Sequence, residues 1–283
     1  MDGEVSAIRR AGRRLRAAVG GRLPEPLYHA IWQRAVPRLG LGRLLGHRVP
    51  AMIDASRVAE IERWPADALS DPVELERRLP TLGISADFAP VLPAPLRAHA
   101  GEGVEAGQYP NQFAPYLAFV GGLRISSYIE IGVDHGGTFL ITTAYLNRRH
   151  PVERAVAVDR FEVPALRDGR SAARTTDVLK LDSASKRFAR YLAEAGPFDL
   201  ALIDGDHSES RCRADFELLS RRARVIALHD IVGANTPGVR AVWKWIRTTR
   251  ASEYDLHEFT AQYAEVERAT SERYMGIGVA VRR

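Results

Sequence analysis

Two short polar clusters carry the residues best suited to chemistry. The first reads Asp-Gly-Asp-His over residues 204–207, and the second reads His-Asp over residues 229–230. Each follows an apolar run of strand-like composition, so both are expected at strand ends. An Asp-Gly turn explains neither the second acid nor the histidine of the first cluster. Two acidic strand ends of this kind favour a divalent cation, and an imidazole suits proton transfer near neutral pH.

Structural alternatives account for parts of these clusters. Asp206 could cap the helix that is predicted to follow it, and a lone histidine such as His229 is more often a hydrogen-bonded structural residue. Neither alternative explains both clusters together. We therefore expect Asp204 and Asp230 to face each other across a cleft as a candidate cation site.

A glycine-rich turn predicts a site for a nucleotide-like ligand. Residues 126–138 read SSYIEIGVDHGGT, a strand-forming run followed by Gly132, Gly136 and Gly137 and then by a helical pattern. This arrangement lets a backbone approach a ligand at a helix N-terminus. The spacing differs from G-x-G-x-x-G, so a dehydrogenase is not expected. A plain tight turn is the structural alternative.

Acids at the ends of the next two predicted strands extend that site. Asp159 lies about twenty residues beyond the turn, where a carboxylate can accept hydrogen bonds from ribose hydroxyls. Asp182 and Ser183 end the following strand, where an adenine edge would lie. For these two residues a helix N-cap is an equal alternative.

Alternating elements must position these residues. From residue 110 onward strand-like and helical runs alternate, which predicts a parallel sheet with helices on both faces. Two further runs, over residues 254–260 and 274–281, are expected to pair antiparallel at the sheet edge, joined by a short polar segment. Ligands of such sheets lie beyond the carboxyl ends of the strands. A doubly wound, Rossmann-like α/β domain over residues 106–283 follows.

Residues 1–105 are expected to form an N-terminal helical region that acts as a lid or in oligomerisation. The net charge of +5 is uneven, because residues 1–48 hold ten arginines against three acids and the remainder is net −2. A solvated helix face or a subunit contact is the first interpretation of this basic arm, so we expect a homo-oligomer. Peripheral membrane contact is an alternative, and nucleic acid is not an expected partner.

Composition indicates the compartment. The single cysteine, Cys212, excludes a disulfide framework, and no segment is apolar for long enough to span a bilayer. A cytoplasmic location is therefore expected.

The order of the motifs EIGVDHGGT, AVAVDR, FDLALIDGDHSES and VIALHDIV resembles the class I S-adenosylmethionine-dependent methyltransferases. More narrowly, it resembles the branch with macrolide-sugar O-methyltransferases and cephalosporin-hydroxylase-like proteins. The resemblance covers about residues 110–250 and implies S-adenosyl-L-methionine as cofactor and the sheet order 3-2-1-4-5-7-6. It assigns cofactor binding to Glu130, Gly132, Gly136, Gly137, Thr138, Asp159, Arg160, Asp182, Ser183 and Asp204.

The resemblance also implies a metal site and a reaction. Metal-dependent members of the branch bind Mg²⁺ at positions that correspond to Asp204, His229 and Asp230. An imidazole among them points to Mg²⁺ on two carboxylates or to another divalent metal. His207 is the expected general base, with Asp206 as its orienting partner or as the alternative base.

The expected acceptor is a hydroxyl of a sugar or of a glycosylated natural product, a small molecule or glycan. A non-catalytic S-adenosylmethionine-binding scaffold and a nucleic-acid methyltransferase are the alternative functions.

Aromatic residues raise two smaller questions. Tyr109 belongs to a polar and aromatic run before the first strand that could overhang the cofactor, whereas Phe113 and Tyr116 are expected in the core. Trp243 and Trp245 lie on different faces of one predicted helix. One of them is expected in the core and the other in the acceptor pocket.

Overall fold

The computed structural model describes residues 53–89, 91–270 and 273–283. The helical patterns and the basic arm predicted within residues 1–52 lie outside the described residues. Residues 53–283 form one compact unit. The domain boundary expected near residue 105 stays a prediction, and the residues on both sides of it belong to this unit.

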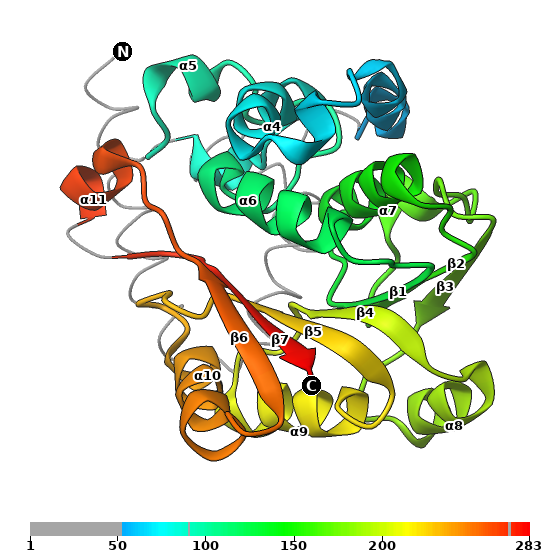
Figure 1. Ribbon diagram of the computed structural model, residues 1–283. Helices are drawn as coiled ribbons and strands as arrows, with labels where there is room; N and C mark the ends of the chain where they lie inside the picture. Colours follow the sequence, from blue (N-terminus) through cyan, green and yellow to red (C-terminus); the bar gives the residue numbers. More distant parts are fainter. Residues whose placement is uncertain (1–52, 90, 271–272) are drawn as a thin grey trace, which may run out of the picture. The chain divides into compact units, whose positions relative to one another are not determined.

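A seven-stranded sheet forms the centre of the molecule (Figure 1). Its strands are β1 (Ser127–Ile131), β2 (Arg154–Asp159), β3 (Thr175–Lys180), β4 (Phe198–Ile203), β5 (Ala223–His229), β6 (Tyr254–Phe259) and β7 (Ile277–Arg282). The order is β3-β2-β1-β4-β5-β7-β6, which confirms the expected doubly wound α/β fold. The first five strands are parallel, and β7 runs antiparallel to both β5 and β6.

Helices cover both faces of the sheet (Figure 1). Helices α6 (Pro110–Gly121) and α7 (Gly137–Arg149) pack into one hydrophobic core, in which Phe113 and Tyr116 are buried as expected. Helices α8 (Lys186–Ala195), α9 (Glu209–Leu219) and α10 (Pro237–Thr249) pack into the other. Central strands such as β4 and β5 are apolar on both faces because each face meets a helix layer.

The segment before α6 is built from short helices. They are η2 (Ala55–Arg63), η3 (Ala68–Ser70), α4 (Pro72–Arg78), η4 (Leu79–Leu82), η5 (Ala86–Phe88) and α5 (Ala94–Arg97). Asp71 caps α4 by accepting a hydrogen bond from Val73. Helix η2 is a 3₁₀ helix, in which Ile61 is the buried residue. A single buried anchor does not supply the apolar stripe that an amphipathic α-helix needs.

Packing joins these short helices to the core of α6 and α7. Trp64, Leu69 and Leu75 are buried in that core, and the Tyr145 hydroxyl of α7 donates a 2.6 Å hydrogen bond to the Leu69 carbonyl. The segment is therefore an integral layer over one face of the sheet.

The C-terminal edge differs from the expectation in one respect. Strands β6 and β7 pair antiparallel as predicted. However, the connection between them contains helix α11 (Ala264–Thr270) rather than only a short polar segment. Val266 of α11 is fully buried in a small cluster with Ile84 and Tyr109, which gives this helix a tertiary anchor.

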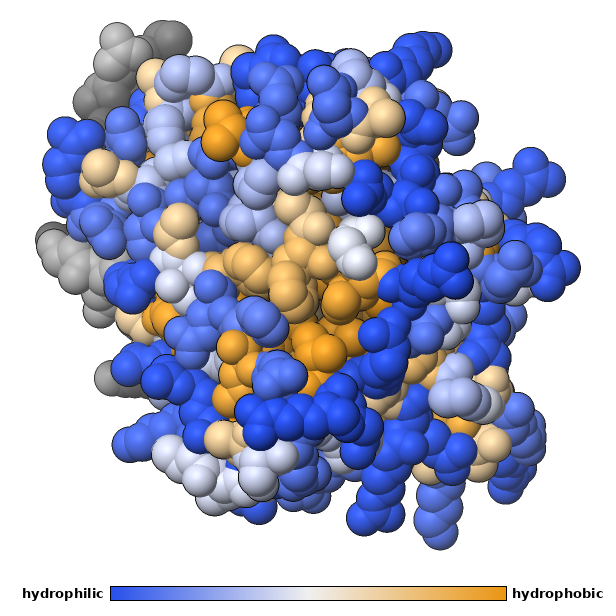
Figure 2. All heavy atoms as spheres, in the orientation of Figure 1, coloured by the Kyte–Doolittle hydropathy of each residue, from blue (hydrophilic) through white to orange (hydrophobic). Residues whose placement is uncertain are grey.

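The surface in the orientation of Figure 2 gathers apolar residues near its centre, between α6 and the sheet, with hydrophilic residues around them. Within the described residues, no helix is both long and apolar enough to cross a membrane.

Candidate active site

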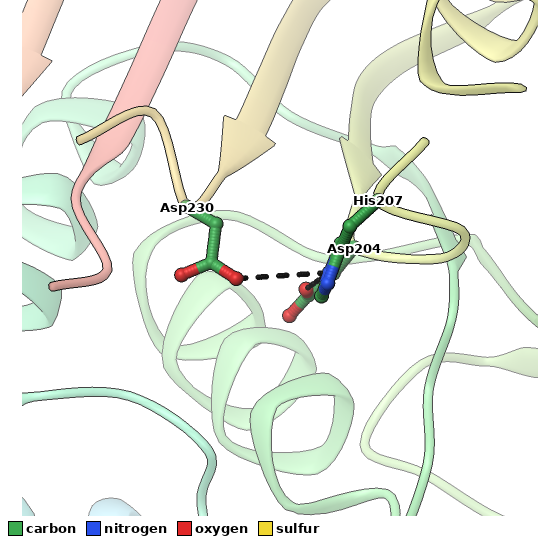
Figure 3. Close-up of side chains that lie close together, drawn as sticks. All are labelled: Asp204, His207 and Asp230. Carbon is green, nitrogen blue, oxygen red and sulfur yellow. Dashed lines mark hydrogen bonds and ion pairs between the residues drawn. The ribbon is translucent and has the colours of Figure 1, made fainter. Parts of the chain in front are cut away.

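Two carboxylates and one imidazole meet at the carboxyl ends of β4 and β5. Asp204 follows β4 directly, His207 lies three residues further along the same loop, and Asp230 follows β5. The Nε2 atom of His207 lies 3.4 Å from Asp204 Oδ1 and 3.7 Å from Asp230 Oδ2 (Figure 3). Parallel pairing of β4 with β5 brings the two strand ends side by side. Asp204 and Asp230 thus both lie within 4 Å of His207, and the prediction that they face each other across a cleft stays a prediction.

His229, the last residue of β5, lies behind this cluster. It is 4% exposed, and its Nδ1 atom lies 3.0 Å from Asp204 Oδ1. Its Nε2 atom has no hydrogen-bond partner among the described residues. His207, rather than the expected His229, completes the group of three potential ligands with Asp204 and Asp230. The metal role of His229 stays a prediction.

The charges of the cluster depend on one another. Burial alone would raise the pKa of Asp204, but His229 and His207 lower it to about 2. Burial alone would lower the pKa of His229, but the Asp204 and Asp230 carboxylates raise it above its ordinary value. The site therefore stabilises a carboxylate beside an imidazolium.

The backbone of Asp230 is in a sparsely populated conformation. Its φ of 65° lies in the left-handed region, which is uncommon for a residue other than glycine. The next residues hold it there, because Ile231 donates a hydrogen bond to the Gly276 carbonyl and Val232 donates one to the Met275 carbonyl. Such backbone strain concentrates at functional sites, where it orients a side chain.

Asp206 contributes to the structure of the loop. Its Oδ1 accepts a 3.0 Å hydrogen bond from the backbone N–H of Ser208, which is the N-cap residue of α9. The structural alternative thus accounts for part of its role, although Ser208 rather than Asp206 is the cap. Its function as orienting partner of His207, or as alternative base, stays a prediction.

The donor set fits a divalent cation. One potential ligand atom from each of Asp204, His207 and Asp230 lies within 4.8 Å of the other two. Two carboxylates with an imidazole suit Mn²⁺, Fe²⁺ or Zn²⁺ better than Mg²⁺, which prefers oxygen ligands.

The glycine turn lies directly against this cluster. Gly132 has a φ of 86°, and a Cβ atom on it would lie 2.1 Å from the Asp204 carbonyl oxygen. Only glycine permits this approach, so the end of β1 and the end of β4 touch at this residue. Gly136, with a φ of 101°, is the N-cap of α7, and Gly137 and Thr138 begin the helix. The predicted cofactor turn and the candidate catalytic cluster are thus neighbours.

Glu130 points into the core. It is 1% exposed, and the Tyr128 hydroxyl donates a hydrogen bond to its Oε2 atom. Burial raises the pKa of Glu130 well above its ordinary value, although the Tyr128 hydrogen bond opposes this rise. The neutral carboxyl form is therefore favoured, and cofactor contact by Glu130 stays a prediction.

Asp159 braces the glycine turn. Its Oδ2 accepts a hydrogen bond from the backbone of Asp134 in the turn, and its Oδ1 accepts one from Phe161. Each oxygen keeps a second lone pair that can accept from a ribose hydroxyl. The half-buried Arg160 follows it at the same strand end.

Asp182 and Ser183 connect the end of β3 to α9. Asp182 pairs with Arg211, and Ser183 hydrogen-bonds to Asp215. The N-cap alternative for Asp182 and Ser183 is wrong, because α8 begins at Lys186 and Ser185 is its cap. Their place beside an adenine stays a prediction.

The two tryptophans of α10, of which one was expected in the core and the other in the acceptor pocket, lie in different surroundings. Trp243 is buried and its Nε1 donates a 2.7 Å hydrogen bond to Glu258. Trp245 packs edge-on against Phe216 and beneath the guanidinium of Arg213, both on α9. These contacts place Trp245 between α9 and α10 instead of in an acceptor pocket.

Sequence reasoning missed Glu105 and Gln108. Both side chains are buried, and both carry polar atoms that have no hydrogen-bond partner among the described residues. No sequence motif indicates Glu105, because its position beside α7 depends on which segment of the chain packs against that helix.

A comparison with known protein families matches part of the chain. Residues 129–231 match the family model described as a methyltransferase domain. No curated protein matches the sequence. The matched segment begins in β1 and ends just after Asp230, so it contains both the glycine turn and the Asp204 cluster. The sheet order is β3-β2-β1-β4-β5-β7-β6, and the match to the methyltransferase-domain model covers the part of it from β1 to the end of β5.

Solved structures resemble the chain at low identity. An O-methyltransferase from Bacillus cereus in complex with SAH is 16% identical, with coverage of 81% of this chain and 96% of that chain and a TM-score of 0.46. The O-methyltransferase TomG from Streptomyces achromogenes, involved in tomaymycin synthesis, is 16% identical, with coverage of 83% and 99% and a TM-score of 0.41. The MycE methyltransferase of mycinamycin biosynthesis, in complex with Mg and SAH, is 15% identical, with coverage of 62% and 49% and a TM-score of 0.43.

Proposed function

We propose that this protein is a methyltransferase that transfers the methyl group of S-adenosyl-L-methionine to an alcohol hydroxyl of a sugar or of a glycosylated natural product. The cluster of Asp204, His207 and Asp230 beside the glycine turn supports the proposal. A binding protein for the cofactor would have no need of two carboxylates and an imidazole at this point. The sugar itself is an expectation from the sequence resemblance.

The cluster addresses the main chemical difficulty of the reaction. An alcohol is a poor nucleophile near neutral pH, so its proton must be removed as it attacks the sulfonium methyl group. His207 is half-buried, and its Nε2 atom lies 3.4 Å from Asp204 Oδ1 and 3.7 Å from Asp230 Oδ2. In the proposed mechanism it accepts the hydroxyl proton, and Asp204 and Asp230 stabilise the resulting imidazolium.

Positioning supplies a second contribution. Holding the hydroxyl oxygen in line with the methyl group can lower the barrier by roughly 7 to 11 kcal/mol. The close approach of Gly132 to the Asp204 carbonyl places the glycine turn against the end of β4, three residues before His207. Asp159, Asp182 and Ser183 would hold the nucleoside part of the cofactor from the neighbouring strand ends.

A divalent cation is compatible with the same residues. Asp204, His207 and Asp230 would hold it, with His229 supporting Asp204 from behind. Such an ion would lower the pKa of a bound hydroxyl. A cation bound through Nε2 of His207 would prevent that atom from accepting a proton, so the metal-assisted and metal-free versions make opposite demands on His207.

The experiment measures release of S-adenosylhomocysteine from S-adenosylmethionine with a panel of sugar glycosides and glycosylated macrolides. We expect turnover with at least one hydroxyl acceptor and a fall of about 100-fold or more for His207→Ala, with cofactor affinity retained. Unchanged turnover by this variant would refute the role of His207. Methylation confined to amine acceptors in a matched panel would refute O-methylation.

Removal of metal ions by chelation distinguishes the metal-assisted mechanism from the metal-free mechanism. Wild-type protein is dialysed against EDTA, and turnover is measured before and after Mn²⁺ or Mg²⁺ is returned. Loss and recovery of activity support the metal-assisted version, and unchanged activity supports His207 as the base.

A further inference from the structure

Glu105 is a buried acid beside the glycine turn. It is 4% exposed, and its Oε1 atom has no hydrogen-bond partner among the described residues. The backbone of Ala86 hydrogen-bonds to its carboxyl group, and His135 Nδ1 lies 3.8 Å from Oε2, beyond hydrogen-bond distance. Within the described parts of the chain, no lysine or arginine lies within 4.0 Å of it. His135 is thus its potential cationic neighbour among the described residues, too distant for a hydrogen bond, and a buried carboxyl group with one unpartnered oxygen favours a ligand that supplies a charged donor.

The backbone at Glu105 lies on the first turn of α7. A Cβ atom on Gly137 would lie 2.4 Å from the Val104 carbonyl oxygen and 2.8 Å from the Ala106 nitrogen. Glu105 itself has a φ of 52°, which is uncommon for a residue with a side chain. The fold thus holds this acid in a strained conformation against the residue that begins the helix.

The N-terminus of α7, in contrast to Glu105, favours an anionic group of a ligand. The helix has 13 residues, and its N-cap, Gly136, provides no side chain to accept hydrogen bonds from the first N–H groups. Such a helix start favours an anion through its free N–H groups and its dipole. Two adjacent features therefore select opposite charges: the helix start selects an anion and Glu105 selects a cation. An α-amino acid zwitterion carries both charges on one carbon.

We propose that Glu105 binds the ammonium group at the amino-acid end of S-adenosylmethionine, while the start of α7 binds the carboxylate. The proposal rests on the proposed function, since it requires this cofactor. It makes Glu105 a positioning residue for the cofactor from a segment outside the sheet.

Local electrostatics are consistent with a cationic ligand. Burial raises the pKa of Glu105, His135 opposes the rise, and Asp87 and Asp134 add to it. A bound ammonium group would stabilise the charged carboxylate in this acidic neighbourhood. The amide of Gln108, buried and without a partner among the described residues, is a second polar group in the same segment.

The test compares two ligands on the full-length protein by calorimetry. S-adenosylhomocysteine has the amino-acid end, and 5′-methylthioadenosine lacks it but keeps the nucleoside. We expect Glu105→Gln, which keeps the shape of the side chain, to weaken S-adenosylhomocysteine by about 10- to 100-fold, as for loss of a charged hydrogen bond. Its affinity for 5′-methylthioadenosine should match that of wild type, which also shows that the variant has a folded pocket.

Glu102→Gln is the matched control, because Glu102 lies in the same loop but is exposed. It should bind both ligands as wild type does. Equal affinity of wild type and Glu105→Gln for S-adenosylhomocysteine would overturn the assignment while leaving the proposed function intact. Equal weakening of both ligands would also overturn it, because the effect would then lie in the pocket as a whole. A wild-type protein that binds neither ligand would refute the proposed function as well.

Discussion

Two acids at the ends of neighbouring strands, Asp204 after β4 and Glu130 in β1, are both largely removed from water but differ in charge. Asp204 faces two histidines, which lower its pKa to about 2. Glu130 faces the neutral hydroxyl of Tyr128, and burial raises its pKa well above the ordinary value. Burial penalises the charge of both, so the partner decides which acid stays ionised. The acid with the lowered pKa lies in the candidate active site, and the acid with the raised pKa lies in the core.

Among the variants that test this difference between Asp204 and Glu130, the largest effect is expected when the charge of Asp204 is removed. We expect Asp204→Asn to lower methyl transfer by about 100-fold or more, because the histidines lose the carboxylate that stabilises an imidazolium. Release of S-adenosylhomocysteine measures the effect. Asp255→Asn, an exposed acid on β6, is the control and should keep wild-type activity. Retained activity of Asp204→Asn would show that this carboxylate is not needed.

Asp215 is a third buried acid, and its contribution to the free energy of unfolding is expected to depend on pH. Burial raises the pKa of Asp215 to about 6, although Ser183 and Arg211 oppose the rise. Because the folded-state pKa is raised, the stabilising effect of the neutral form is complete below about pH 4 and is lost as pH rises towards and through about 6. The free energy of unfolding of wild type, relative to Asp215→Asn, should therefore fall by about 2 to 3 kcal/mol between pH 4 and pH 8. Urea unfolding across this range measures it, and a constant difference would contradict the prediction.

Removal of the Tyr128 hydroxyl tests how much its hydrogen bond to Glu130 stabilises the fold. Tyr128→Phe removes the hydrogen bond to Glu130 and leaves a buried carboxyl oxygen without its partner. We expect a loss of about 1 to 2 kcal/mol in the free energy of unfolding at pH 7. Tyr254→Phe is a matched control, since Tyr254 is equally buried but lies at the far edge of the sheet. An equal loss in both variants would mean that the Glu130 contact has no special value.

The smallest effect is expected from Glu130→Gln. A carboxyl group whose raised pKa favours its neutral form differs little from an amide, so stability at pH 7 should change by less than about 1 kcal/mol. The raised pKa of Glu130 also fixes the sign at higher pH. Wild type loses stability as pH rises through that pKa, and the variant does not, so Glu130→Gln should become relatively more stable in alkaline solution. Thermal unfolding at pH 7 and pH 9 measures both results, and a large loss at pH 7 would show that Glu130 is ionised.

Much of the fold could be predicted from local patterns. Alternation of apolar strands with helical runs indicated the sheet and its crossover helices, because a strand covered on both faces has a distinctive composition. The antiparallel pairing of β6 with β7 followed from the same patterns. Helix α11 and the 3₁₀ form of η2 did not, because their few buried residues, such as Val266 and Ile61, gain their anchors from distant segments.

The candidate site divides in the same way. Strand-end residues Asp204, His207 and Asp230 could be brought together from sequence, since parallel neighbours end at one edge of a sheet. The displacement of His229 behind Asp204 and the inward direction of Glu130 could not, because both depend on which face of a strand meets the core.

The sequence by itself determined the parallel sheet, the glycine turn and the chemical types of the residues at the strand ends, because each depends on neighbours along the chain. Only the tertiary structure decided which acid has a raised pKa, that both His207 and His229 lie within 4.0 Å of Asp230, and which segment lies against α7. Those outcomes depend on burial and on contacts between residues far apart in the chain, such as Glu105 with His135 and Gly132 with Asp204. Short-range patterns do not carry such contacts, and here they set the electrostatics of the site.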